Sequence, residues 1–499
     1  MFNTRAKVRR TLPGPPPRRP LAAASGAGVG IGHHPLVRGD ENARLYQYEQ
    51  AVKQAFAGIE AVLRQLAAWQ HESDFVGRAQ GHARATLGFE LPAELLQDTW
   101  IQALDTGRLY AWCVFETFRR MSAEFFEQRP LAVEGAASFH AFLQQCGFHT
   151  LDISPCADGR LAHVIRYVLR LPHEPVRRKS YAGALFDVED SLEKWVETEM
   201  LRQREGRPNA ADAPTRYLKV AVYHHSSTRP DQEGCAAHGS DTRRAAQGAL
   251  ERLQAFRQGV ENSFCCGASI DLLLIGVDTD TDAIRLHLPD ADGAMDVDDY
   301  IDANELYHAT ANAAMGDAEA TVQDHLRRHC SAANMTVPAP GMLRLAARLL
   351  CANLAQIDYV RRYHGGRYAD IGHQERFIGM GIGFEEVQLR NLTYFAYLRT
   401  VEEGAQDLDV GIKIFNGLNV RRGLPIPVVI RYDYHGQVPG ARARAEARCQ
   451  QLEAALQQRY HAYVEQGLLH TLLMVRDCHA GASAEVVGGS LLCSDQEVH

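Results

Sequence analysis

Apolar residues in the first part of the chain recur with the period of an α-helix. Their spacings of four and three residues place them on one face of an amphipathic helix: Val52, Phe56, Ile59, Leu63 and Leu66. Asp40, just before this stretch, has a side chain suited to an N-cap. Aromatic residues repeat the pattern between residues 91 and 129. The sequence therefore predicts a helical domain over residues 40–134 whose apolar faces form a core.

From about residue 148 onward, short apolar runs alternate with segments of helical period. Strands are predicted over 148–153, 217–225 and 271–277, and helical segments over 161–171, 240–262 (capped by Ser240), 297–331 and 340–363. Strands that alternate with capped helices are typical of an α/β sheet whose strands run mostly parallel. We therefore predict an α/β domain over residues 135–380.

The last part of the chain repeats this order faintly. Four short resemblances occur in the same order: Leu151-Asp152-Ile153 with Leu408-Asp409-Val410, Tyr223-His224 with Tyr434-His435, Gly239 with Gly440, and Leu273-Leu274-Ile275 with Leu472-Leu473-Met474. Their common order predicts an internal duplication, with a degenerate second copy over residues 381–499. In this alignment the positions of Cys156, Asp158 and Arg160 are taken by Lys413, Phe415 and Gly417. We therefore expect the second copy to be structural.

The composition is that of a soluble globular protein, with 46% hydrophobic and 23% charged residues in 499 residues. It excludes disorder along the whole length, and a chain of this size is expected to form about three domains. No apolar run approaches the roughly 18 residues that a membrane helix needs. The Arg-rich start lacks the apolar segment of a secretory signal.

Charge is distributed unevenly along the chain. Residues 1–39 contain seven Lys and Arg, no acid and six prolines, so the remaining residues carry a net charge of −15 against −8 for the whole. Such a segment cannot bury enough surface to offset its ordering entropy, and we expect a disordered basic, Pro-rich arm. Its charge favours an acidic partner surface. The acidic body argues against nucleic-acid binding.

Eleven cysteines are scattered without tight repeated spacing, which indicates a reducing compartment in which most thiols are small buried hydrophobes. Two of them stand beside polar residues at predicted strand ends. Cys156-Ala-Asp158-Gly-Arg160 follows one strand, His224 closes the next, and Cys235 comes soon after. Sites in open α/β sheets form at such strand ends. Two thiolates and one imidazole suit tetrahedral Zn²⁺ with a fourth position open.

This arrangement predicts attack of a zinc-bound hydroxide on a small electrophile, because zinc lowers the pKa of bound water to about 7. Asp158 could accept the proton of the water or coordinate the metal itself, and Arg160 could hold that carboxylate off the zinc in a bidentate pair. The alternative is that Cys156 is a buried thiol, Asp158–Arg160 a loop ion pair and His224 a strand-end histidine. Spacing alone leaves both open.

The motifs together resemble those of the β-type carbonic anhydrases. The resemblance rests on C-x-D-x-R at a strand end, Ala182-Gly183 in RRKSYAGALF, and a strand-end His followed by a Cys. The usual His-x-x-Cys is here His224-x10-Cys235. The arm, the helical domain, the catalytic domain and the degenerate copy resemble the shell-associated branch of α-carboxysomes. So do the stretches EGCAAHGSD and YHGGRYADIGHQERFIGMGIGFE.

The resemblance implies one zinc ion per chain, held by Cys156, His224 and Cys235, with Asp158 and Arg160 as the catalytic dyad. Successive strand residues face opposite sides, so only one of His224 and His225 can enter the pocket. The ten-residue gap before Cys235 in the family and the Tyr434-His435 echo favour His224. His238 and the pair Cys265-Cys266 are the other metal candidates. The degenerate copy would take the place of the second subunit of simple β-type enzymes, and homo-oligomers would form from such chains.

Three functions follow as hypotheses. The first is a zinc carbonic anhydrase that supplies CO2 to Rubisco inside a carboxysome, with the arm docked on Rubisco, the shell or a scaffold. The second is a non-catalytic assembly protein stiffened by zinc, which would need a fourth protein ligand, with Asp158 the obvious one. The third is a cysteine nucleophile activated by His224. The arm could also be a solubilising tail or a transit peptide.

Overall fold

The computed structural model describes residues 33–97, 103–128, 131, 136–172, 176–210, 212–263, 269–332, 336–370, 372–396 and 404–491. The predicted arm lies outside these residues up to position 32, and so does the pair Cys265-Cys266. Residues from His34 onward form one compact unit.

The N-terminal segment is helical, as the apolar period predicts. It contains α1 (Glu41–Trp69), α2 (Phe75–Thr86), a 3-10 turn (Ala93–Leu95), α3 (Thr106–Gln128) and α4 (Ala136–Gln145). Asp40 occupies the N-cap position of α1 as predicted, but its side chain makes no cap hydrogen bond and pairs with Arg44 instead. The α3 residue Phe118 packs on Phe377 of the second sheet, with ring centroids 5.1 Å apart.

The first sheet has the order β2-β1-β3-β4-β5-β6. Its strands are β1 (Thr150–Pro155), β2 (Arg177–Arg178), β3 (Arg216–His225), β4 (Ser269–Asp278), β5 (Ile284–His287) and β6 (Ile301–Asp302). The first four strands in this order run parallel to one another. Strand β5 is antiparallel to β4, and β6 is antiparallel to β5. Residues 217–225 of β3 are all buried, as expected of a central strand covered on both faces.

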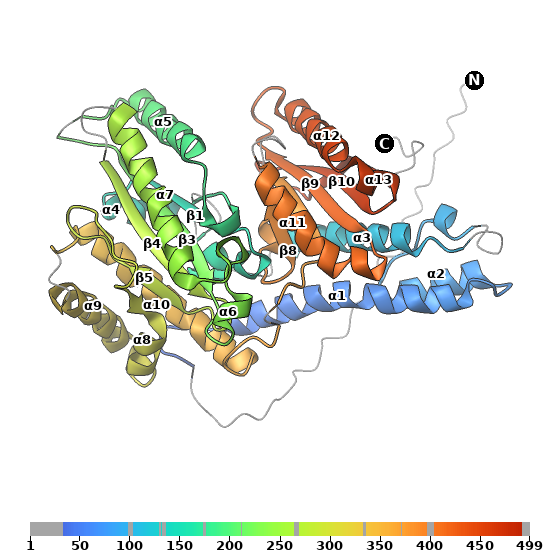
Figure 1. Cartoon of the computed structure of the whole chain (residues 1–499), viewed down its shortest axis with the longest axis horizontal. Helices are drawn as coiled ribbons and strands as arrows, with labels where there is room; N and C mark the ends of the chain where they lie inside the picture. Colours follow the sequence, from blue (N-terminus) through green and yellow to red (C-terminus); the bar gives the residue numbers. More distant parts are fainter. Residues whose placement is uncertain are drawn as a thin grey trace, which may run out of the picture. The chain divides into compact units, whose positions relative to one another are not determined.

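Helices cover this sheet (Figure 1). They are α5 (Val188–Arg204), α7 (Thr242–Ser263), α8 (Ala303–Thr310), α9 (Met315–Ala332) and α10 (Pro340–Tyr363), with a short α6 (Pro230–Glu233). Helix α7 packs on β3 and β4, whereas α8 and α10 pack against β5. The predicted cap of α7 was wrong: Ser240 has a φ of +63°, and the Asp241 carboxylate accepts the hydrogen bond from the Arg244 N–H at 3.0 Å.

The second sheet has the order β11-β10-β9-β7-β8. It contains β7 (Phe377–Ile382), β8 (Thr393–Ala396), β9 (Ile426–Tyr434), β10 (Leu469–Asp477) and β11 (Glu485–Gly489), with helices α11 (Ala405–Leu418), α12 (Ala441–Arg459) and α13 (His461–Glu465). In the reverse direction this order is β8-β7-β9-β10-β11, and it matches β2-β1-β3-β4-β5 of the first sheet in strand direction. In both sheets the last of these strands, β11 or β5, is antiparallel to its neighbour. The chain is therefore α/β with a repeated sheet.

The register corrects the alignment of the two copies. Tyr434 pairs with Asp477 as His225 pairs with Asp278, and residues 408–410 lie in α11 rather than in a strand. The counterparts of the four polar site positions then follow from the paired strands. Ile382 stands for Cys156, Phe384 for Asp158, Glu386 for Arg160 and Asp433 for His224. The expected boundary between residues 380 and 381 falls inside β7.

Candidate metal centre

Cys156 lies directly behind the end of β1. The strand runs to Pro155, two residues further than the predicted 148–153, and the Cys156 N–H donates to the Val222 carbonyl of β3 at 3.0 Å. The next residues form a 3-10 turn over Gly159–Leu161 and a π-helical turn over Val164–Val168, instead of the predicted regular helix. The turn keeps Asp158 and Arg160 close to the strand end.

His224 and His225 close β3 and are both buried. His224 lies with Cys156 and Cys235 in one group, whereas His225 is not part of it. The His225 ring lies tilted against that of Tyr223, and the His225 backbone carbonyl accepts from the Thr279 N–H at 2.9 Å. Burial, reinforced by the nearby Arg285, lowers the pKa of His225 to about 3. His225 is therefore a neutral core histidine outside the group.

Cys235 is carried by a loop that packs on Ala182-Gly183. It follows α6 and precedes a 3-10 turn over Ala236–His238. Gly183 has a φ of +67°, and a Cβ there would lie 2.9 Å from both the Ala237 Cβ and the His238 Nε2. His238 Nε2 donates to the Gly183 carbonyl at 3.1 Å. The glycine therefore allows the Cys235 loop to approach, and His238 serves that contact.

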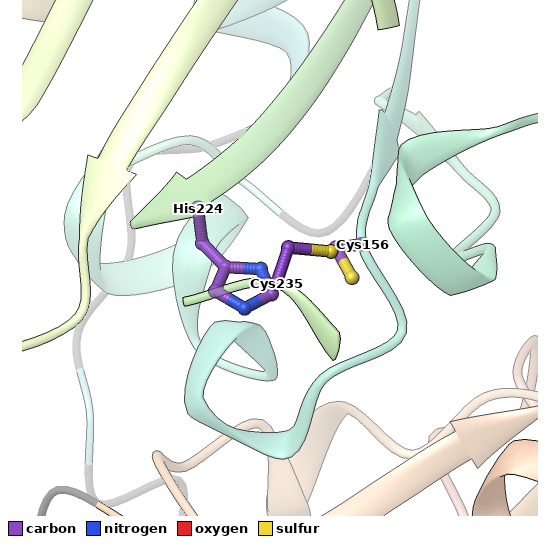
Figure 2. Close-up of side chains that lie close together, drawn as sticks. All are labelled: Cys156, His224 and Cys235. Atoms are coloured by element: carbon purple, nitrogen blue, oxygen red, sulfur yellow. The ribbon is translucent and has the colours of Figure 1, made fainter. Parts of the chain in front are cut away.

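The three side chains come together from three separate segments (Figure 2). Their ligand atoms all lie within 4.8 Å of one another, and all three residues are buried. Tetrahedral zinc with bonds of roughly 2.0 to 2.3 Å places its donors about 3.3 to 3.8 Å apart, and the observed spacing is compatible with that arrangement. His224 Nδ1 is a buried nitrogen without a hydrogen-bond partner among the described residues, as expected of an atom that can hold a metal.

The two thiols share a hydrogen bond. This bond, together with burial, raises the pKa of Cys156 well above its usual value, and the same bond lowers the pKa of Cys235. Cys235 is therefore the first of the pair to ionise. Both thiols must lose their protons to hold a metal, so binding would release protons.

Asp158 and Arg160 form a buried bidentate ion pair beside this group. Arg160 Nε donates to Asp158 Oδ1 at 3.0 Å and Nη2 to Oδ2 at 2.7 Å, and their side chains are 7% and 2% exposed. Arg160 Nη1 also donates to the Glu233 carbonyl at 2.8 Å. Burial alone would raise the pKa of Asp158, but Arg160, His224 and His373 hold it well below its usual range. Asp158 Oδ2 lies 3.3 Å from His224 Nε2.

Two further residues at this site were not predicted from the sequence. His373 and Glu375 form a second close group with Asp158. They lie in the segment between α10 and β7, more than 200 residues from Asp158. The only signal was the stretch GHQERF inside the longer segment that resembles the family.

Residues of the second sheet region also contact the site loops. The Asn391 N–H donates to the Gly159 carbonyl at 2.9 Å, and the Ala182 N–H donates to Asp407 Oδ1 at 2.5 Å. Burial raises the pKa of Asp407 to about 6, although the hydrogen bond from Ala182 opposes this. The second copy therefore holds both loops that flank the three-residue group.

Comparison with known families accounts for almost the whole chain. Models of the carboxysome shell carbonic anhydrase match its N-terminal domain at residues 34–126, its catalytic domain at 138–373 and its C-terminal domain at 374–491. A carboxysome shell carbonic anhydrase of Prochlorococcus marinus (strain MIT 9313) is 53% identical over 95% of this chain and 92% of its own. That of Halothiobacillus neapolitanus is 45% identical over 92% and 90%. Among the described helices, none is both long and apolar enough to cross a membrane.

Proposed function

The chain belongs to the carboxysome shell carbonic anhydrase family, and on this premise we propose that it is a zinc enzyme that interconverts CO2 and bicarbonate. The observation that carries the proposal is the meeting of Cys156, His224 and Cys235 beside the Asp158–Arg160 pair. These three donors would hold one zinc ion and leave a fourth position for the reaction. Zinc bound there would supply Lewis-acid activation of water at neutral pH.

Asp158 and Arg160 supply the chain's own chemistry in this proposal. Both carboxylate oxygens of Asp158 accept hydrogen bonds from Arg160, so the carboxylate stays ionised and is held away from the metal position. It can accept a hydrogen bond from the reacting water and orient it toward CO2. Arg160 is fixed in turn by the Glu233 carbonyl. The low exposure of the pair strengthens these interactions because little water screens them.

The alternative is a non-catalytic assembly protein with structural zinc. It requires Asp158 to leave Arg160 and complete the coordination sphere, since structural zinc sites are usually filled. The bidentate pair favours the catalytic proposal. A cysteine nucleophile would need an accessible thiol, whereas Cys156 and Cys235 are 5% and 2% exposed.

We place the enzyme in the carboxysome, where bicarbonate dehydration would supply CO2 to Rubisco. The basic arm of residues 1–39 would bind an acidic face of Rubisco, the shell or a scaffold, and the chains would form homo-oligomers. The support for this setting is the family to which the chain belongs, together with the excess of Lys and Arg in the arm. Pull-down of Rubisco with and without residues 1–39, in rising salt, tests the arm's role.

Stopped-flow CO2 hydration with zinc analysis tests the enzyme proposal. We expect about one zinc per chain, retained in Asp158→Ala and lost in Cys235→Ser, and hydration lost in both. The matched controls are Asp409→Ala, which removes an exposed carboxylate paired with Arg459, and Cys351→Ser on α10. Both should behave as wild type. Zinc without hydration in the wild type would leave the assembly protein, and alkylation-sensitive activity without zinc would leave the nucleophile.

A further inference from the structure

His373 and Glu375 form a buried histidine–carboxylate pair next to Asp158. His373 Nδ1 lies 3.0 Å from Glu375 Oε1, and one ligand atom from each of Asp158, His373 and Glu375 lies within 4.8 Å of the others. The Glu375 side chain is fully buried, whereas that of His373 is 28% exposed. His373 therefore reaches from the Asp158 carboxylate to the solvent, a position that no role assigned above explains.

Gly159 shows how closely this pair is built into the site. A Cβ at position 159 would lie 2.3 Å from Glu375 Oε1 and 2.6 Å from its Cγ. The residue between Asp158 and Arg160 must therefore lack a side chain for the Glu375 carboxylate to lie where it does. Glu375 packs against Gly159, in the loop between Asp158 and Arg160. It also orients the imidazole of His373, which lies beside Asp158.

The charges around His373 favour a ring that holds a proton. Burial alone would lower the pKa of His373, but Asp158 and Glu375 outweigh it and raise the pKa to about 9, with Arg160 opposing them. Since Glu375 accepts the hydrogen bond from Nδ1, Nε2 is the nitrogen that remains for proton exchange. A partly exposed ring can recover a proton from buffer after giving one up.

We propose that His373 carries the proton between the reaction pocket at Asp158 and the solvent, and that Glu375 is the positioning residue that holds its ring. The inference rests on the proposed function, because the reaction CO2 + H2O ⇌ HCO3⁻ + H⁺ releases or consumes one proton and transfers no electrons. In hydration the imidazolium first gives its Nε2 proton to buffer, and Nε2 then takes up the proton that the reaction releases. In dehydration the imidazolium delivers it, and the proton leaves in the product water.

Oxygen-18 exchange on the zinc-loaded full chain separates the two steps. The interconversion of CO2 and bicarbonate at equilibrium requires no proton from outside, whereas release of labelled water does. In His373→Gln we expect the first rate to stay within a factor of about two and the second to fall at least about tenfold in weak buffer. Added imidazole should restore it. His461→Gln is the matched control, since it removes an exposed histidine paired with Glu465.

The outcomes distinguish the two proposals. A wild type without equilibrium interconversion would refute the enzyme proposal itself. An unchanged water-release rate in His373→Gln, or an equal reduction of both rates, would overturn the role of His373. Loss of the metal ion in His373→Gln would also overturn this role, because it would make His373 a metal ligand. Glu375→Gln should lower water release with the same imidazole rescue, and circular dichroism and zinc content show whether each variant is folded.

Discussion

Removing Arg160 is expected to destabilise the chain more than removing the whole ion pair. Arg160→Gln takes away two charge-assisted hydrogen bonds to Asp158 and one to the Glu233 carbonyl. It leaves the Asp158 carboxylate, 7% exposed, without its main counter-charge. Breaking a buried pair in this way costs roughly 3 to 5 kcal/mol, whereas replacing both partners by neutral groups costs much less. The difference between the two costs is the free energy of leaving the Asp158 carboxylate buried without a counter-charge.

The assay is urea unfolding of the zinc-loaded protein at pH 7.5 for wild type, Arg160→Gln, Asp158→Asn and the double variant. We expect the double variant to unfold at a higher urea concentration than Arg160→Gln, with a coupling free energy of about 2 kcal/mol or more. Because the chain has several domains, the first transition is compared rather than one global value. If the effects of the two single changes simply add, the carboxylate is not stabilised by Arg160 and the argument from burial fails.

Three further outcomes are expected. Gly159→Ala should lower the rate of CO2 hydration and lower the free energy of unfolding by roughly 1 to 3 kcal/mol, because the new Cβ would overlap Glu375. Stopped-flow and calorimetry measure the two effects, and an unchanged protein would contradict the close packing. The folded pKa of Asp407, about 6, exceeds its unfolded value, so stability present at pH 4 is lost as the pH rises through 6. Asp407→Asn keeps an acceptor for the Ala182 N–H and should stabilise the chain at pH 7.5 by up to about 3 kcal/mol, with no gain at pH 4. Chelation should lower the melting temperature and added zinc restore it; equal melting curves would argue against a bound metal.

Strand and helix identities were predictable wherever packing and local pattern agree. β3 and β4 match their predictions to within two residues at each end, because long apolar runs with β-branched residues suit covered parallel strands. The segment after Cys156 could not be predicted, since its apolar period is helical. Its backbone instead forms a 3-10 turn and a π-helical turn that keep Asp158 and Arg160 at the strand end.

The internal repeat shows a second limit of prediction from the sequence. Leu408-Asp409-Val410 resembles a strand of the first copy in letters, yet it lies in α11, and the true counterpart of β1 is β7. Three-residue matches carry too little information to fix a register, and a strand register depends on hydrogen-bonded partners. In the same way, spacing could place Cys156, His224 and Cys235 on neighbouring strand ends. It could not bring in His373 and Glu375, which reach the site only through tertiary packing.

The second copy has a buried ion pair at the positions that correspond to the candidate metal centre of the first copy. Arg431 pairs with Glu386 and Asp433, the counterparts of Arg160 and His224, and the two closest side chains are fully buried. An internal ion pair therefore involves the positions that correspond to Arg160 and His224 of the first copy.

Residues of this second copy also contact the loops of the candidate metal centre. Ala157, between Cys156 and Asp158, belongs to the apolar core of the second sheet, and Asn391 and Asp407 bind the backbone of Gly159 and Ala182. A metal centre works only when its ligands and dyad are held within fractions of an ångström. Loops fixed from outside by a neighbouring sheet satisfy that need. We infer that loss of the second site and rigid support of the first are two consequences of the same duplication.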